Sequence, residues 1–318
     1  MAAEGAVAGR GVCVGRMATS FGGGMADFKP LELSDKAKVM DYLRRFPPQI
    51  SEHTFTNLYV WRYHGPVRLA QVGEALVFLE LKKGERMAIG PPLGHVTPAA
   101  LLDLLRGVGV SSCQRLPDRM AEIWRQAGIR VMPDRDNFDY VYLRRDLADL
   151  AGRRYHRQKN LVNRCLAAHD CEYAPMTSEC LNEVADMVDR WFAERELDQT
   201  PGLSHEYWAL RETLDHFVEF GLIGAAIRIR KRIEAFTIGE RLNETTAVVH
   251  FEKAMGGYDG LYQLVNQWFC QHGLAEFEFV NREQDLGMPG LRKAKESYHP
   301  HHMVEKYIAW CEGEVPPR

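Results

Sequence analysis

The segment from Asn281 to Lys295 carries a high concentration of groups that could do chemistry. It contains two carboxylates, amides, two glycines and several cations, and it follows a stretch, 275–280, in which phenylalanine and glutamate alternate. Such alternation predicts a β-strand. Ligand sites of α/β proteins tend to lie just beyond the carboxyl ends of strands. This segment is therefore the first candidate site, with Asn281 as a candidate substrate-binding residue.

Two carboxylates of the segment, Glu283 and Asp285, lie two residues apart in a predicted loop. Such a pair can hold a substrate ammonium group or act as a general base. If the following proline begins a helical turn, Arg292 and Lys295 share one face and could stabilise an oxyanion or a phosphate. These four residues are candidate catalytic residues. The structural alternative is a salt-bridged loop in which both carboxylates pair with Arg292 and Lys293.

A second polar strand is predicted over 246–253, where His250 and Glu252 would point to one side and Lys253 to the other. His250 and Glu252 could polarise or deprotonate a substrate in a central cleft. A lone strand histidine is more often a hydrogen-bonded core residue. The hypothesis is therefore a catalytic role for Glu252 and substrate-binding roles for His250 and Lys253.

The loop after this strand, 254–260, is rich in glycine and precedes a predicted helix. Free backbone N–H groups at a helix N-terminus can cradle phosphate. If the protein transfers an acyl group from acyl-CoA, Gly256 and Gly257 are candidate residues for binding this cofactor. The acyl-CoA signature R/Q-x-x-G-x-G/A is met only in part, since Lys253 leads and Tyr258 stands where a small residue is expected. The alternative is a plain strand-to-helix turn without a cofactor.

A basic stretch has no acidic residue between Asp149 and Asp170. As a helix, it would place its cations and amides on neighbouring faces that could hold phosphates. The alternatives are a solvated helix face and pairing with acids elsewhere in the chain. The candidate substrate-binding residues in this stretch are Arg154, His156, Lys159, Asn160, Asn163 and Arg164.

No metal site is predicted. The run His-Pro-His-His at 299–302 lacks partners that could complete a tetrahedral set, and the trio Cys165, His169 and Cys171 is equally incomplete. The seven cysteines form no C-x-x-C pair, which is typical of reduced thiols in a cytoplasmic protein.

Each half of the chain repeats one order of predicted elements: helices, a three-stranded meander, a helix and a strand. The first half has helices over 34–45, 97–106 and 117–128, and strands over 67–72, 75–81, 87–89 and 140–143. The second half has helices over 153–168, 178–196, 204–219 and 260–272, and strands over 223–229, 233–239, 246–253 and 275–280.

This order is that of an acyltransferase fold of the GNAT type. We expect an α/β (α+β) protein with two tandem GNAT-like domains, whose mixed, largely antiparallel sheets are flanked by helices. The predicted domains are 25–146 and 147–318. Residues 1–24 are expected to be a disordered leader or a mis-assigned start.

Composition limits the function classes. The 318 residues are 46% apolar, enough for two domains with real cores, and the net charge of −3 argues against a globally basic nucleic-acid binder. No apolar run approaches the ~18 residues that a membrane-spanning helix needs. We expect a cytoplasmic protein, with attachment to the membrane surface as an alternative.

Several of these segments together resemble a known family, over roughly residues 28 to 310. The segments are 152–164, Ile-Gly-Glu at 238–240, Val-His-Phe-Glu-Lys-Ala at 249–254, Asn-Arg-Glu-Gln-Asp-Leu-Gly at 281–287 and Leu-Arg-Lys-Ala-Lys-Glu-Ser-Tyr at 291–298. They are similar to the C-terminal domain family of bacterial phosphatidylglycerol lysyltransferases. The resemblance implies tandem GNAT-like domains, as in Fem-type aminoacyltransferases, and aminoacyl transfer from aminoacyl-tRNA to a lipid hydroxyl. The lipid-modifying enzymes carry a long N-terminal membrane region, which has no counterpart in this sequence, so the acceptor stays open.

The leading hypothesis is a transferase that moves an aminoacyl group from aminoacyl-tRNA to a hydroxyl or amine. The basic helix would hold the tRNA, and a single pocket would be lined by Glu252, Glu283, Asp285, Arg292 and Lys295. One alternative is an acyl-CoA-dependent N-acyltransferase that uses CoA. Another is a non-catalytic module that binds tRNA or another phosphate ligand. The donor amino acid, the acceptor and the oligomeric state stay open.

Overall fold

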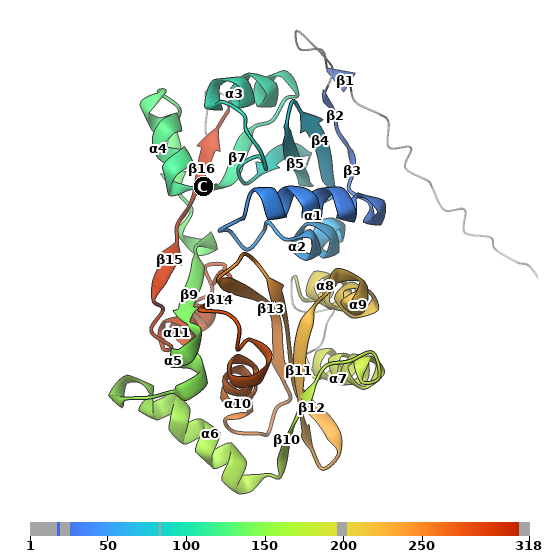
Figure 1. Ribbon diagram of the computed structural model, residues 1–318, viewed down its shortest axis with the longest axis vertical. Helices are drawn as coiled ribbons and strands as arrows, with labels where there is room; N and C mark the ends of the chain where they lie inside the picture. The colour runs from blue at the N-terminus through green and yellow to red at the C-terminus, as the bar shows by residue number, and fades with distance from the viewer. Residues whose placement is uncertain (1–17, 20–25, 83, 196–201, 312–318) are drawn as a thin grey trace, which may run out of the picture.

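The computed structural model describes residues 18–19, 26–82, 84–195 and 202–311 (Figure 1). The predicted leader, 1–24, lies outside these ranges apart from β1 (Ala18–Thr19), which pairs with β2 (Ala26–Asp27). The α-helices are α1 (Lys36–Arg45), α2 (Phe55–Val60), α3 (Pro98–Gly107), α4 (Asp118–Gln126), α5 (Arg144–Asp149), α6 (His156–Ala168), α7 (Leu181–Ala193), α8 (Leu203–Asp215), α9 (Phe217–Phe220), α10 (Leu261–Trp268) and α11 (Pro289–Glu296). Short 3₁₀ turns precede α1 and α6, and a π-helical turn, Phe269–Gly273, extends α10.

Two seven-stranded mixed sheets form the frame. The first has the order β3 (Lys29–Pro30), β4 (Val67–Val72), β5 (Ala75–Lys82), β6 (Glu85–Ile89), β7 (Ser112–Pro117), β16 (Lys306–Trp310) and β8 (Val131–Pro133). The second has the order β10 (Cys171–Pro175), β11 (Ile223–Ile229), β12 (Arg232–Arg241), β13 (Thr246–Ala254), β14 (Phe279–Asn281), β9 (Asp139–Leu143) and β15 (His302–Val304). In each sheet one neighbouring pair is parallel, β6 with β7 and β13 with β14, and the other pairs are antiparallel.

The two sheets exchange a strand. The sixth position of the first sheet is taken by β16 from the C-terminal end, and the sixth position of the second sheet by β9 from the first half (Figure 1). A cut near residue 146 therefore does not separate the sheets, because β9 precedes it yet belongs to the second sheet. As a boundary between domains, residue 146 stays a prediction.

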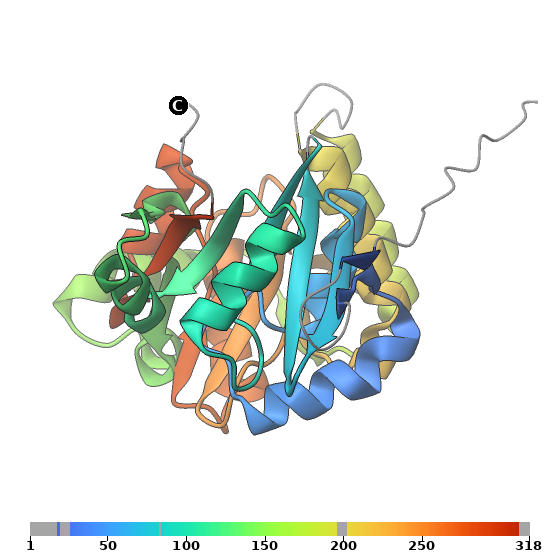
Figure 2. The same cartoon turned by 90° about the horizontal axis from the view of Figure 1, so that it is seen from above.

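Apolar side chains gather in three clusters. One lies between the two units and combines residues of α1, α2, β4 and β5 with residues of α7, α8, β12 and β13. A second covers the other face of the second sheet under α5, α6 and α10. The third lies under α3 and α4 on the outer face of the first sheet, across which α3 runs (Figure 2). The shared central cluster joins the halves through buried apolar surface.

Most predicted elements are confirmed, including the fold of two mixed sheets flanked by helices. The predicted N-cap of α3 is also confirmed, because the Thr97 side chain accepts a hydrogen bond from the Ala100 N–H and Pro98 follows it. The strand predicted over 275–280 is wrong in extent: β14 is only Phe279–Asn281. Strands β3, β7, β8, β10, β15 and β16 were missed. β3, β8, β10 and β15 are short edge strands, and β16 is the exchanged strand. β7 is an interior strand, but its residues, Ser-Cys-Gln-Arg-Leu-Pro, show no regular apolar alternation. No helix among the described residues is long and apolar enough to cross a membrane.

Candidate active site

The candidate site lies where two parallel strands separate. β13 and β14 pair from Thr246 with Phe279 to Val248 with Asn281. β14 ends at Asn281, whereas β13 continues for six more residues to Ala254. The polar side chains at 250 and 252 therefore face the loop that follows Asn281 rather than a paired strand. Both were predicted to share a side, and both do contact that loop.

His250 owes its position to a β-bulge. The register between β12 and β13 passes from Ile238 opposite Phe251 to Gly239 opposite Val249, which leaves His250 as the extra residue. Such bulges re-aim side chains and are frequent beside active sites. Gly239 permits the close approach, because a Cβ there would lie 2.3 Å from the carbonyl oxygen of Val248.

His250 is clamped between two carboxylates. Its Nε2 lies 2.9 Å from Oε1 of Glu240 and its Nδ1 lies 2.8 Å from Oε1 of Glu283. Both ring nitrogens must donate to such partners, so the ring carries a positive charge. Burial lowers the pKa of His250, but the bonds to the two carboxylates outweigh burial and raise the pKa to about 9. His250 is thus a positioning cation for Glu283, not a neutral base near pH 7.

Glu283 also contacts a residue from the first half of the chain. Its Oε1 accepts a hydrogen bond of 2.9 Å from the side-chain amide of Asn57 on α2. Its backbone is left-handed, with φ of 55°, which is unfavourable for a residue other than glycine. The turn is held because Glu283 N–H donates to Oδ1 of Asn281 at 2.8 Å and its carbonyl accepts from Tyr140 N–H at 3.2 Å. These two backbone hydrogen bonds hold the strained turn and so fix where the Glu283 side chain leaves the loop.

Asn281 was predicted to bind substrate, and its position argues against this. Its side chain is fully buried. Its Oδ1 accepts from Glu283 N–H, and its Nδ2 donates to Oδ2 of Asp139 at 3.0 Å. Both polar atoms are therefore engaged in shaping the loop.

Asp285 is equally enclosed. It has no exposed surface and accepts two bonds from Arg292, at 2.8 and 2.9 Å, a bond of 3.0 Å from Arg135 and one of 2.6 Å from the Tyr140 hydroxyl. Burial alone would raise the pKa of Asp285, but these bonds and the Gly287 N–H hold it well below its usual range. Asp285 and Arg292 therefore form an ion pair, with Asp285 buried and Arg292 half-buried, that fixes the loop against α11. With these partners, neither residue is placed for its predicted role as base or oxyanion partner.

Lys295 contacts the backbone of the same loop. Its Nζ donates to the carbonyl of Arg282 and lies 3.4 Å from the carbonyl of Glu283. Burial, followed by the neighbouring Arg282 charge, lowers the pKa of Lys295 to about 8. It is a lysine whose charge changes close to neutral pH.

Glu252 forms a third polar group with residues that the sequence did not single out. Its Oε1 accepts from Nη2 of Arg282 at 2.9 Å and its Oε2 accepts from Nδ2 of Asn266 at 3.2 Å. The rings of Tyr142 and Tyr298 lie 5.8 and 5.0 Å from the Arg282 guanidinium.

The five residues predicted to line one pocket are thus gathered around the loop 282–285, but they do not share one cavity. Asp285 is fully buried, and both of its oxygens already accept hydrogen bonds from the protein. Lys253, also predicted to bind substrate, lies with other partners: its Nζ is 2.6 Å from Glu206 and 4.2 Å from the Trp191 ring. Gly256 and Gly257 are exposed in the turn before α10, as expected.

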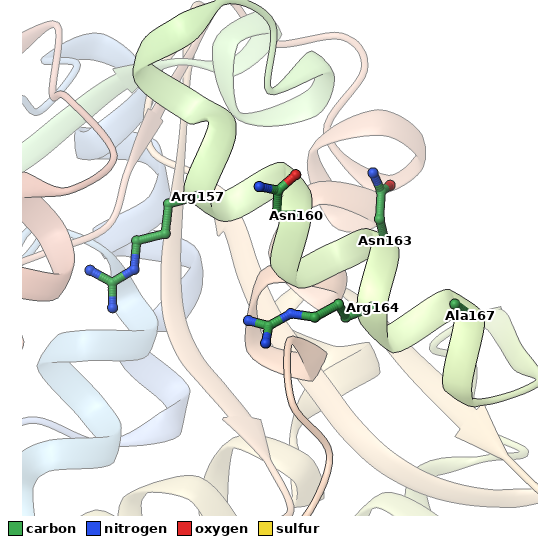
Figure 3. A pocket seen from close by; sticks show the side chains of 5 residues that line it. All are labelled: Arg157, Asn160, Asn163, Arg164 and Ala167. Atoms are coloured by element: carbon green, nitrogen blue, oxygen red, sulfur yellow. The ribbon is translucent and has the colours of Figure 1, made fainter.

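The basic stretch is a helix with two faces. Tyr155, Gln158, Val162 and Cys165 are buried, and the predicted phosphate-binding residues are exposed. A pocket on the outer face is lined by Arg157, Asn160, Asn163, Arg164 and Ala167, all from α6 (Figure 3).

Few acids neutralise the cations of α6 and of the 3₁₀ turn before it. Arg154 pairs with Asp146 at 2.7 Å and Arg164 with Asp259 at 3.0 Å. Among the described residues, Arg157 and Lys159 form no ion pair. The inner face of α6 reaches the candidate site, because Gln158 donates to the carbonyl of Ser297 at 2.7 Å, next to Tyr298.

Sequence reasoning missed Asn57, Glu240, Asn266 and Arg282. Glu240 stood in a quoted motif, Ile-Gly-Glu, and the glycine beside it signalled a close backbone approach. Arg282 lay inside the first candidate segment but was not assigned a role. Asn57 and Asn266 carry no local signal, since only folding places them beside Glu283 and Glu252.

The two sheets have the same mixed strand order, and in the second sheet the parallel strands β13 and β14 separate beside charged side chains. This arrangement is a tandem acyltransferase fold of the GNAT type. The chain belongs to the family of the C-terminal domain of phosphatidylglycerol lysyltransferase, whose model matches residues 43–310.

Several solved structures share this fold. A conserved protein of unknown function from Bacteroides thetaiotaomicron is 30% identical, with a TM-score of 0.84 over 90% of this chain and 99% of the other. The C-terminal domain of a putative lysylphosphatidylglycerol synthetase from Agrobacterium fabrum shares the fold at 14% identity, with a TM-score of 0.65 over 88% and 92% of the two chains. L-PGS from Bacillus licheniformis does so at 16% identity, with a TM-score of 0.63 over 87% and 91%. A comparison with curated proteins finds no match.

Proposed function

We propose that this protein transfers an aminoacyl group from aminoacyl-tRNA to a hydroxyl or amine acceptor. The observation that supports it most is the exposed, poorly neutralised basic face of α6, whose buried face reaches the turn that carries Tyr298. RNA phosphates would bind the outer face, and the acceptor end would enter between β13 and the loop 282–285. Family membership favours an aminoacyl donor, since the family description names a lysyltransferase.

The chemistry requires little beyond positioning. The acceptor oxygen or nitrogen attacks the carbonyl carbon of the aminoacyl ester, and the ester oxygen leaves with the tRNA as a hydroxyl group. Because the ester is already activated, orientation and charge stabilisation supply most of the effect. Glu283, aimed by His250 and Asn57, is the group we assign to receive the acceptor proton, and its Oε2 has no partner among the described residues.

The test is transfer of label from total aminoacyl-tRNA to a panel of acceptors, with products identified by mass. The panel contains phosphatidylglycerol vesicles, a diacylglycerol and peptides with free amines. A labelled product from the wild type that falls at least tenfold in Glu283→Gln supports the proposal. Binding of tRNA without product from any donor and acceptor would instead indicate a binding module. A thermal shift with millimolar CoA, together with acetyl transfer, would favour an acyl-CoA donor.

The α6 assignment has its own test. The double variant Arg157→Glu, Lys159→Glu should weaken tRNA binding and lower the slope of log affinity against log salt by about 2, one for each lost phosphate contact. The matched control is Lys38→Glu, Arg119→Glu, which changes the same charge at exposed positions on α1 and α4. Equal loss of binding in both double variants would contradict the assignment to α6.

A further inference from the structure

The surroundings of Glu252 include two buried polar atoms that no other described residue pairs with. Asn266 on α10 is only 1% exposed, and its Oδ1 has no hydrogen-bond partner in the part of the chain that the structure describes. The Nη1 of Arg282 is likewise buried and has no partner among those residues. Leaving such groups unsatisfied costs stability, so each in a folded protein calls for an explanation.

The two atoms have opposite character and flank the same carboxylate. The Asn266 amide nitrogen must face Oε2 of Glu252, because the opposite orientation would set two oxygens against each other. Its Oδ1 is thereby left as an acceptor. Arg282 donates through Nη2 to Oε1 of Glu252, which leaves Nη1 as a donor. A carboxylate, an amide acceptor and a guanidinium donor thus share one small region.

An aminoacyl group carries the hydrogen-bonding groups that complement these three side chains. Its α-ammonium carries three N–H donors, and its carbonyl oxygen is an acceptor. We propose, on the basis of the aminoacyl-transfer function above, that Glu252, Asn266 and Arg282 form the subsite for the aminoacyl moiety of the donor. Glu252 and Asn266 Oδ1 bind the α-ammonium, and Arg282 Nη1 donates to the ester carbonyl. Tyr142 and Tyr298, which flank the guanidinium, limit its movement.

The same arrangement disfavours a simple acyl donor. An acetyl group has a carbonyl for Arg282 but no ammonium for Glu252 and Asn266. It would leave Asn266 Oδ1 unpaired and would gain nothing from the Glu252 charge. The subsite therefore selects for a free α-amine next to the carbonyl, whatever side chain the amino acid carries.

The probes are the amides of the twenty amino acids, their Nα-acetyl derivatives and the amines that lack the carbonyl group, titrated into the full chain by calorimetry. At least one amide should bind, and its Nα-acetyl derivative and its amine should each bind about tenfold more weakly or worse. This comparison needs only the wild-type protein. If no amide binds, or if acetylation does not weaken binding, the proposal is wrong and the two orphaned atoms hold water only.

Variants locate the binding. Glu252→Gln and Asn266→Leu should each weaken the best amide by about tenfold. Glu278→Gln, which neutralises an exposed carboxylate before β14, should leave it unchanged. Binding that survives in both site variants, shown to be folded by their melting curves, overturns the assignment.

Two outcomes separate this subsite from the proposed function. If both site variants lose amide binding but the wild type transfers nothing from aminoacyl-tRNA, the subsite stands and the proposed tRNA donor is wrong. If the wild type transfers the aminoacyl group and Glu252→Gln transfers it equally well, the proposed function stands and the subsite is wrong.

Discussion

Glu283 and Asp285 are two residues apart, yet their surroundings assign them different tasks. Asp285 is surrounded by two guanidinium groups, a tyrosine hydroxyl and a backbone N–H. Glu283 meets one imidazolium and one amide through a single oxygen, which leaves the other for a substrate. Only Glu283 has the access that a catalytic group needs.

Removal of the Asp285 charge should destabilise the fold. Asp285→Asn leaves Arg292 and Arg135, both partly exposed, without their charged partner, and the loss of these charge-assisted hydrogen bonds costs about 2 kcal/mol. The measurement is the free energy of unfolding from urea titration. Asp136→Asn is the matched control, because Asp136 is 57% exposed and contacts the same Arg292. Its effect should stay within about 0.5 kcal/mol. Equal effects of the two variants would contradict a structural role for Asp285.

His250 should give the fold a dependence on pH. Its pKa is raised from 6.5 to about 9 on folding, so the folded state binds the proton more tightly than the unfolded state. The stabilisation is fully present below pH 6.5 and is lost as the pH rises to about 9. The difference in unfolding free energy between the wild type and His250→Gln should therefore fall by about 3 kcal/mol over this window. A difference that does not change with pH would show that His250 is neutral in the fold.

The start of α10 packs directly against α6. Gly260, with φ of 88°, ends the glycine-rich turn, and a Cβ there would lie 2.0 Å from the carbonyl oxygen of Leu161 on α6. The phosphate-binding role predicted for Gly256 and Gly257 stays a prediction. The role of Gly260 is packing, because it lets the basic helix lie directly against α10.

Gly260→Ala should therefore cost more than a left-handed conformation alone. A positive φ costs an alanine about 1 kcal/mol, and the contact with the Leu161 backbone adds to this, for a total of about 3 kcal/mol. Gly257→Ala is the control, since Gly257 has a φ of 86° and nothing within 4 Å of its Cβ position. It should lose about 1 kcal/mol in a denaturant titration. Similar losses in both variants would show that α6 and α10 can move apart.

The strand exchange makes each half of the protein depend on the other. Lys306, on the exchanged β16, is fully buried and lies 2.7 Å from Asp139 on the exchanged β9 and 2.6 Å from Glu52. Asp139 in turn bonds Asn281 and Ser51. This buried charge network connects both sheets to the candidate loop, so each half depends on a strand of the other.

A fragment of residues 26–146 should not fold alone. It lacks β16, and it exposes both β9 and the central apolar cluster. Hydrogen exchange should show little protection in β7. Appending residues 302–311 through a flexible linker should restore part of that protection, because β16 then pairs with β7 and β8. A fragment that unfolds cooperatively without the added segment would support the domain boundary near residue 146.

Much of the fold could be predicted from the sequence because periodicity and turn chemistry are local. The meanders, α3 with its cap and the basic helix α6 each show their pattern within a few residues. The sequence also determined which segments matter, since the polar motifs at 238–240, 249–254 and 281–298 all meet around one loop.

Tertiary structure decided the roles within those segments. Whether a carboxylate is a base or half of a structural ion pair depends on groups distant in the chain, such as Tyr140 for Asp285 and Asn57 for Glu283. The strand exchange and the unpaired atoms of Arg282 and Asn266 are likewise invisible to local pattern. The physical reason is that burial, electrostatic environment and hydrogen-bond satisfaction are set by which segments meet in space, and residues near in sequence do not specify that.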